Sequence, residues 1–265
     1  MRVPKPGAAA SCAACDMHHA GPVRRRAQAA DYVVALAGNP NTGKSTVFNA
    51  ITGLRQHTGN WPGKTVARAE GAFQHGGARY SLVDLPGTYS LLATSVDEEV
   101  ARDFILFGRP DVTVIVADST CLERNLNLVI QVLAITERAV VCLNLIDEAR
   151  RRGLRVDDRR LARDLGVPVV ATAARQKEGV PQLLDAIGQV ATGRMVCRPR
   201  RLASRSPELR RALAALVARL EAAFPGLPNA QWAALRLLDG DARIIDAVRS
   251  GELGELRRES EEVRV

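Results

Sequence analysis

Aromatic residues make up only 4% of this 265-residue chain, and lysine occurs at four positions although the chain carries 37 basic residues. No apolar run approaches the roughly 18 residues that a membrane-spanning helix needs, and the N-terminus lacks the apolar segment of a secretory signal. The five cysteines show no disulfide framework. These absences predict a soluble chain from a reducing compartment, and a hydrophobic content of 46% is enough to bury a core.

The formal net charge of +8 is unevenly distributed along the chain. Residues 1–30 and residues 194–265 each carry a net +4, whereas residues 31–193 are neutral. A ribosome- or RNA-associated protein, the main alternative from another functional class, needs a basic face on its folded domain. The neutral middle therefore argues against nucleic acid as a partner. The basic segment 194–211 is expected to be either a solvated linker or a contact with anionic lipid head groups.

Short apolar runs alternate with amphipathic stretches between residues 31 and 193, which predicts a three-layer α/β fold. Strands are expected at Asp31–Ala37, Val66–Phe73, Tyr80–Val83, Val112–Ala117, Val140–Leu143 and Val167–Ala171. Helices are expected from Lys44 onward and at Glu98–Phe107, Leu122–Ile135, Arg159–Leu165 and Val180–Val190.

The pattern changes after residue 193, where no strand is expected. Residues 194–205 predict a linker, and residues 206–265 predict an all-helical domain. Its helices are expected at Pro207–Phe224, Asn229–Leu238, Asp241–Ser250 and Leu253–Val263. Residues 1–30, with several prolines and glycines, predict a flexible basic arm.

A glycine-rich motif follows the first predicted strand and opens a predicted helix, which is the context that a phosphate-binding loop requires. The nucleotide-binding residues expected here are Gly38, Asn39, Pro40, Asn41, Thr42, Gly43, Lys44 and Ser45, which fit G-x-x-x-x-G-K-[ST], and the adjoining Thr46. Backbone N–H groups of the loop and the helix N-terminus bind phosphate oxygens. Lys44 is expected to reach the β- and γ-phosphates, and the Ser45 hydroxyl to ligate Mg²⁺.

Two further motifs follow in order, each at the end of a predicted strand. Asp84-Leu-Pro-Gly87 predicts an aspartate that holds Mg²⁺ through water and a glycine N–H that faces the γ-phosphate. Asn144-Leu-Ile-Asp147 predicts guanine recognition, because the Asp147 carboxylate can accept bonds from guanine N1–H and the 2-amino group, a donor pair that adenine lacks. Each motif is weak alone, but together at the carboxyl ends of strands they predict a GTP site.

These residues resemble the TRAFAC-class G proteins and, more closely, the cytosolic N-terminal region of the ferrous iron transport protein B family, FeoB. The principal matching stretches are GNPNTGKSTVFNAITG at 38–53, HTGNWPGKTVARAEG at 57–71, DLPGTYSL at 84–91 and ERNLNLVIQVL at 123–133. The resemblance covers about residues 31–190. It continues more weakly through WAALRLLDGD at 232–241, which looks like the helical guanine-nucleotide dissociation inhibitor domain of that family.

The resemblance implies a Ras-like P-loop GTPase domain at 31–193 and a helical domain at 206–265. It implies GTP, GDP and Mg²⁺ as ligands, and hydrolysis of GTP that regulates or gates Fe²⁺ uptake. The implied partner is a membrane-embedded iron-permeation domain, absent from this sequence, at the cytoplasmic face of the bacterial inner membrane. Small iron-transport accessory proteins and a homo-oligomer are further partners that the resemblance allows.

The family pattern also implies roles for individual residues. Asn41 occupies the position of an asparagine that ligates K⁺ in potassium-activated G proteins, although a turn asparagine is an equal alternative. Thr65 matches the first-switch threonine that closes on Mg²⁺ and the γ-phosphate, in a loop shaped by residues 60–63. Thr88 stands where a glutamine positions water in Ras-like proteins, so hydrolysis is expected to be slow and K⁺-stimulated. A ribosome- or RNA-associated GTPase and a nucleotide switch with negligible hydrolysis are the alternatives. Lys44, Thr65, Gly87 and Thr88 form the expected catalytic group.

Two positions depart from the family pattern. Lys64 replaces an apolar residue in the first switch. The guanine-cradling loop reads Thr172-Ala173-Ala174 instead of Thr-Ser-Ala, so a serine hydroxyl is missing, and the Ala173 N–H is expected to contact guanine O6.

A short N-terminal cluster has the spacing of metal ligands. Cys12, Cys15 and His18, followed by His19, fit Zn²⁺, Fe²⁺ or Cu⁺ by ligand chemistry. A chance CxxC in a flexible arm is the alternative.

Overall fold

The computed structural model describes residues 30–53, 56–61, 64–92, 95–200, 206–225, 227 and 229–253. The strands are β1 (Tyr32–Gly38), β2 (Gln56–Asn60), β3 (Ala67–His75), β4 (Ala78–Asp84), β5 (Val112–Asp118), β6 (Ala139–Asn144) and β7 (Val169–Ala171). The helices of the sheet-containing part are α2 (Lys44–Thr52), α3 (Val96–Leu106), α4 (Leu122–Ile135), α5 (Ile146–Arg151), α6 (Asp158–Leu165) and α7 (Val180–Ala191), with a short 3₁₀ turn, η1 (Ala174–Gln176). They are followed by α8 (Pro207–Ala223), α9 (Ala230–Leu238) and α10 (Ala242–Ser250).

One sheet contains all seven strands in the order β2-β3-β4-β1-β5-β6-β7. Strands β4, β1, β5, β6 and β7 are parallel, and β2 and β3 form an antiparallel edge. Because β1, β4 and β6 run in the same direction, the three sequence motifs that follow them lie at the same edge of the sheet. This is the edge at which open α/β sheets bind ligands.

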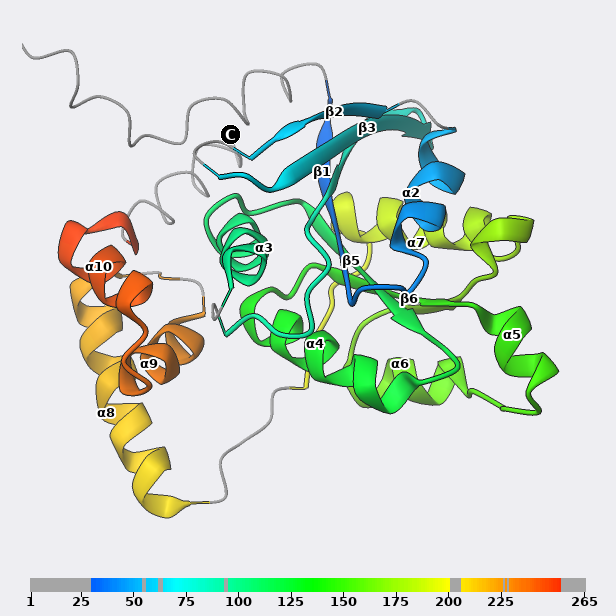
Figure 1. The fold of residues 1–265 in the computed structure, drawn as a ribbon. Coiled ribbons are helices and arrows are strands. Elements are labelled where there is room, and N and C mark those ends of the chain that lie inside the picture. Colours follow the sequence, from blue (N-terminus) through cyan, green and yellow to red (C-terminus); the bar gives the residue numbers. More distant parts are fainter. Residues whose placement is uncertain are drawn as a thin grey trace, which may run out of the picture.

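The sheet is covered on both faces, which confirms the predicted three-layer fold. Helices α2 and α7 pack on one face, and α3 and α4 lie on the other (Figure 1). Every residue of β6 and nearly every residue of β5 is buried, as expected for central parallel strands made of continuous apolar runs. Among the residues that the structure describes, no helix is both long and apolar enough to cross a membrane.

The structure corrects the expected elements at two places. Residues 56–60 form the edge strand β2, paired with β3 from Gln56↔Gly71 to Asn60↔Ala67, where the sequence suggested only a loop. Their polar sequence carries no strand pattern, and pairing with β3 supplies the backbone hydrogen bonds. Residues 146–151 form α5, a helix that the sequence did not indicate. All but the last residue of the expected arm at 1–30, and most of the expected helix Leu253–Val263, lie outside the described residues.

The first part of the expected linker is held against the sheet-containing part. The N–H of Arg198 donates to the carbonyl of Gly166 at 2.9 Å, and the N–H of Arg200 to that of Leu165 at 3.0 Å. Helices α8 to α10 then pack beside α3 (Figure 1). Their buried residues, such as Trp232, belong to one apolar cluster with the core of the sheet.

Candidate functional site

The chain turns sharply between β1 and α2, over the glycine-rich motif. Gly43 has φ 78°, a left-handed conformation that favours glycine, and a Cβ added there would lie 2.4 Å from Asn144 Nδ2. The Thr42 hydroxyl donates to the Asn39 carbonyl at 2.9 Å, which closes the loop. Helix α2 begins at Lys44 without a side-chain cap, so its first N–H groups are available to an anion.

Lys44 reaches from this loop to the end of β4. Its Nζ donates to Asp84 Oδ1 and, at 2.7 Å, to the carbonyl oxygen of Leu85. Burial raises the pKa of the Asp84 carboxyl, although the Lys44 ammonium acts in the opposite direction. The two charged groups that the sequence assigned to phosphate and to Mg²⁺ are therefore neighbours.

The residues after Asp84 run along the same loop. The N–H of Thr88 donates to the carbonyl of Gly38 at 3.3 Å. A Cβ added to Gly87 would lie 3.4 Å from Pro40 Cα, and Thr88 is buried. The Gly87–Thr88 pair thus lies against the phosphate loop.

Three other predicted ligands stand exposed around this loop. Asn41 adopts φ 66° within it, and Ser45 and Thr46 lie in the first turn of α2. Their exposure leaves the side chains accessible to a bound ion or nucleotide.

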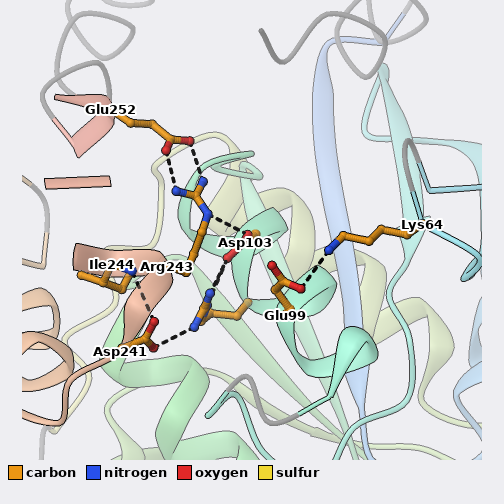
Figure 2. A network of polar contacts seen from close by, with 8 residues as sticks. Lys64, Glu99, Asp103, Asp241, Arg243, Ile244 and Glu252 are labelled. Carbon is orange, nitrogen blue, oxygen red and sulfur yellow. Dashed lines mark hydrogen bonds and ion pairs between the residues drawn. The ribbon is translucent and has the colours of Figure 1, made fainter. Parts of the chain in front are cut away.

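The first-switch segment lies against α3 instead of the phosphate loop. Lys64 Nζ contacts Glu99 Oε2 at 2.9 Å (Figure 2), and the Trp61 ring packs edge-on against Phe104 with ring centroids 5.3 Å apart. Thr65 is exposed in the turn between β2 and β3 and makes no hydrogen bond to the described residues of the loop. The structure therefore does not bring Thr65 to Lys44, and it shows Trp61 packed locally. Pro62 and Gly63 lie outside the described residues.

Asn144 joins the phosphate loop to the predicted guanine loop. Its Nδ2 donates to the Thr42 carbonyl at 3.0 Å, and its Oδ1 accepts from the Ala174 N–H at 3.1 Å and the Thr172 hydroxyl at 3.4 Å. Asn144 is buried, and both the nitrogen and the oxygen of its amide are hydrogen-bonded inside the protein. It positions both loops.

The predicted base-recognition residue, Asp147, lies in the first turn of α5. Its Oδ2 accepts from Gln176 Nε2 at 3.2 Å and from Arg151 at 3.3 Å. The expected free N–H of Ala173 instead donates to the carbonyl of Glu178 at 3.0 Å, so a contact with guanine O6 requires that bond to be exchanged. Gln176 was missed from the sequence, because a glutamine in a loop carries no motif signal.

The N-terminal Cys12, Cys15 and His18 lie outside the described residues. Within the described part of the chain, no group of three or more His, Cys, Asp or Glu side chains could hold a metal ion.

A buried charge network joins the sheet-containing part to the helical part. Arg102 of α3 is fully buried and contacts Asp103 at 3.0 Å and Asp241 at 2.8 Å. Arg243 contacts Asp103 at 3.3 Å and holds both carboxylate oxygens of Glu252 (Figure 2). A cavity of about 240 Å³ is lined by Leu91 and Leu92 of the second-switch segment, residues 84–92, and by Trp232 and Leu235 of α9. The helical part is therefore in contact with elements that flank the nucleotide loop.

The phosphate loop, the segment Asp84–Gly87 and the segment Asn144–Asp147 meet as in a G domain, and comparison with known proteins agrees. The family described as ferrous iron transport protein B matches residues 32–187. The chain belongs to this family.

FeoB relatives resemble the chain beyond the G domain. The Fe(2+) transporter FeoB of Salmonella choleraesuis is 39% identical over 212 residues, which are 78% of this chain and 27% of that protein. The cytosolic domain of the T. maritima FeoB iron transporter in apo form has a TM-score of 0.75 at 36% identity, covering 84% of this chain and 86% of that one. The same domain in a GDP form has a TM-score of 0.75 at 36% identity, covering 84% and 85%. The chain thus spans about a quarter of the length of its curated FeoB relatives, and the Ras-like fold with a helical part is confirmed.

Proposed function

We propose that this chain binds GTP and hydrolyses it to GDP and phosphate. The observation that carries the proposal is the meeting of three motifs at one sheet edge, where Lys44 contacts Asp84 and Asn144 ties the phosphate loop to the guanine loop. The GDP form of the T. maritima relative supports a guanine nucleotide as the ligand. Selection of guanine over adenine then rests on the Asp147 carboxylate, beside the loop formed by Thr172, Ala173 and Ala174.

The donor set fits Mg²⁺. The Asp84 carboxylate lies at the end of β4, and the Ser45 hydroxyl is exposed one residue after Lys44. Carboxylate and hydroxyl oxygens are the hard ligands that Mg²⁺ prefers. When bound, Mg²⁺ neutralises charge on the β- and γ-phosphate oxygens. Thr65 is exposed in the hairpin turn, so its expected part in this site requires the first switch to move.

In the proposed reaction, Lys44 exchanges its bond with Asp84 for oxygens of the β- and γ-phosphates, and Gly87 presents its N–H to the γ-phosphate. The oxygen of a water forms a bond to the γ-phosphorus while the bond to the β–γ bridging oxygen breaks, which yields GDP and phosphate. Thr88 is shorter than a glutamine, and its N–H already donates to Gly38. Turnover is therefore slow. Asn41 is the residue that would hold K⁺, and the ion would supply a positive charge at the phosphates.

The nucleotide cycle would serve iron uptake. Movements of the two switch segments, transmitted through α3 to the helical part, regulate Fe²⁺ passage through a membrane-embedded domain at the cytoplasmic face of the bacterial inner membrane. This proposal is supported by membership of the ferrous iron transport protein B family and by the contact of α3 with both the first switch and α10. Accessory iron-transport proteins and a homo-oligomer belong to the same proposal.

Single-turnover phosphate release with the full chain in excess tests the enzymatic claim. GTP with Mg²⁺ should release phosphate, faster in K⁺ than in Na⁺ buffer, whereas ATP should not. Lys44→Ala should abolish release, and Lys177→Ala, which removes a surface lysine, should not. Equal rates in the two buffers would remove the K⁺ role, and a failure to bind GTP would overturn the proposal.

A second candidate function is a GTP-binding switch with negligible hydrolysis. It is favoured by the burial of Thr88 and by the bond from its N–H to Gly38, since both remove groups that would hold water. Tight GTP binding without phosphate release in either buffer would select this candidate.

A further inference from the structure

Two donors from different elements hold the same oxygen of Asp147. Gln176 Nε2, in η1, lies 3.2 Å from Asp147 Oδ2, and Arg151, one turn further along α5, lies 3.3 Å from it. The terminal torsion of an aspartate is broad when nothing restrains it. Two donors on Oδ2 fix the plane of this carboxylate.

The loop that presents Gln176 is itself closed. The Ala173 N–H donates to the Glu178 carbonyl at 3.0 Å, and Glu178 accepts from Arg150 of α5 at 2.7 Å. Gly179 follows with φ 75°, and a Cβ there would lie 2.1 Å from the Ala171 carbonyl oxygen, so the loop returns in a path that only glycine allows. These contacts join the loop to α5 and set the separation between Gln176 and Asp147.

Guanine offers two parallel donors, N1–H and the 2-amino group, and a carboxylate satisfies both only when its plane coincides with that of the base. Ala173 has no hydroxyl with which to orient this carboxylate. We propose that Gln176 is the positioning residue that fixes the Asp147 carboxylate for guanine, with the exposed Arg151 leaving Oδ2 when the base binds, and that it thereby sets selectivity for purines with a 2-amino group. The proposal rests on the proposed binding of guanine nucleotides.

Gln176 contributes more to this alignment than Arg151 does. The Arg151 side chain is 70% exposed and lies four residues from Asp147 on the same helix, a geometry that solvent screens strongly. Gln176 is also exposed, but it extends from a loop whose backbone is fixed by its own hydrogen bonds, so the fold sets its distance from Asp147. Replacement of Gln176 should therefore alter base selectivity more than replacement of Arg151.

Competition titrations with GDP and IDP test the proposal, because the hypoxanthine base of IDP keeps N1–H and lacks the 2-amino group. In Gln176→Ala, GDP affinity should fall by about three- to ten-fold, the effect of losing one modest hydrogen bond to a charged acceptor. IDP affinity should fall by less than about two-fold, since one donor tolerates a rotated carboxylate. Gln176→Glu should lower the ratio of GDP affinity to IDP affinity further, because the new carboxylate repels Asp147. Lys177→Ala, a change at the adjacent exposed residue, should leave this ratio of affinities unchanged.

The outcomes distinguish a failure of the positioning role of Gln176 from a failure of the proposed nucleotide binding. Equal losses of GDP and IDP affinity in Gln176→Ala, which leave the ratio of the two affinities unchanged, would indicate a merely structural loop residue and overturn the positioning role. A wild-type chain that binds neither nucleotide would instead overturn the proposed function. A reduced ratio in Gln176→Ala with normal thermal unfolding would support the assignment.

Discussion

Replacing Arg102 with methionine should release the helical part from the sheet-containing part. Arg102 lies on α3, has no exposed surface, and contacts Asp241 at 2.8 Å and Asp103 at 3.0 Å. Asp241 is also the N-cap of α10, where its Oδ1 accepts from the Ile244 N–H at 3.3 Å. Removing the guanidinium leaves the Asp241 carboxylate, whose side chain is 10% exposed, without its cationic partner.

The magnitude follows from which carboxylates lose their partner. Breaking a buried ion pair by removing one member costs about 3–5 kcal/mol, because the other charge stays desolvated. Asp103 keeps Arg243 at 3.3 Å, so only Asp241 is left uncompensated and we expect a loss of about 3 kcal/mol. The lost free energy weakens the packing of α8 to α10 on the sheet-containing part. Local opening of these helices should therefore become more frequent before the whole chain unfolds.

Hydrogen exchange of the α9 and α10 amides, with thermal unfolding recorded alongside, measures this effect. Arg102→Met should accelerate exchange in α10 while the amides of β5 and β6 stay protected. Arg249→Met, which removes an exposed arginine from α10, is the matched control. Asp241→Asn retains an N-cap acceptor, so the double variant Arg102→Met/Asp241→Asn isolates the ion pair.

We expect the loss of unfolding free energy in the double variant to be about 2 kcal/mol smaller than the sum of the losses in the two single variants. The neutral amide that replaces the carboxylate no longer needs a cation. Single losses that add to within about 0.5 kcal/mol, or an Arg102→Met chain with wild-type exchange in α10, would refute the reasoning.

Three further predictions concern the site and its surroundings. Asn144→Ala should lower the free energy of unfolding by about 1–3 kcal/mol, because it leaves the buried carbonyl of the phosphate loop and the N–H of the guanine loop without their partner; thermal unfolding checks it, and an unchanged unfolding temperature would contradict it. Burial raises the pKa of Cys142 to about 12, so maleimide at pH 8 should label exposed Cys121 and spare Cys142, as peptide mass spectrometry will show. Because the folded pKa exceeds the ordinary value of 9.0, the unfolded chain loses this proton first, and stability relative to Cys142→Ala should fall from about pH 9 to about pH 12. Lys64→Met removes the 2.9 Å contact with Glu99 and should raise the affinity for a non-hydrolysable GTP analogue relative to GDP by about two- to five-fold; an unchanged ratio would show that this pair does not restrain the first switch.

The central strands were predictable because each is a continuous apolar run of β-branched residues. Val112–Ala117 and Val140–Leu143 lie within the observed β5 and β6, and both observed strands continue to the polar residue that ends them. The edge strand β2 was not predictable, because its residues have no apolar alternation and pair only where β3 offers a free edge. The short α5 escaped detection because six residues are too few to show helical periodicity.

The phosphate and guanine motifs were predictable for a different reason. The loop from Gly38 to Ser45 acts through local backbone geometry, and its glycine at φ 78° and the helix that follows are encoded within a few residues. The ends of β1, β4 and β6 converge once the strands are parallel. Asp84 and Asn144 therefore reach the loop by topology alone.

The sequence by itself thus determined the class of fold, the nucleotide loop and the family, because these depend on short motifs and on strand order. Only the tertiary structure decided which side chains pair across the molecule. Arg102 and Asp241 are 139 residues apart, Lys64 and Glu99 are 35 apart, and Asp147 and Gln176 are 29 apart. Arg102, Asp241, Glu99 and Gln176 carry no motif signal in the sequence. Packing of α10 and of the first-switch hairpin against α3, and closure of the guanine loop on α5, give each group a partner that no local pattern specifies. Arg102 is withdrawn from water completely, whereas the Lys64–Glu99 and Asp147–Gln176 pairs stay partly exposed.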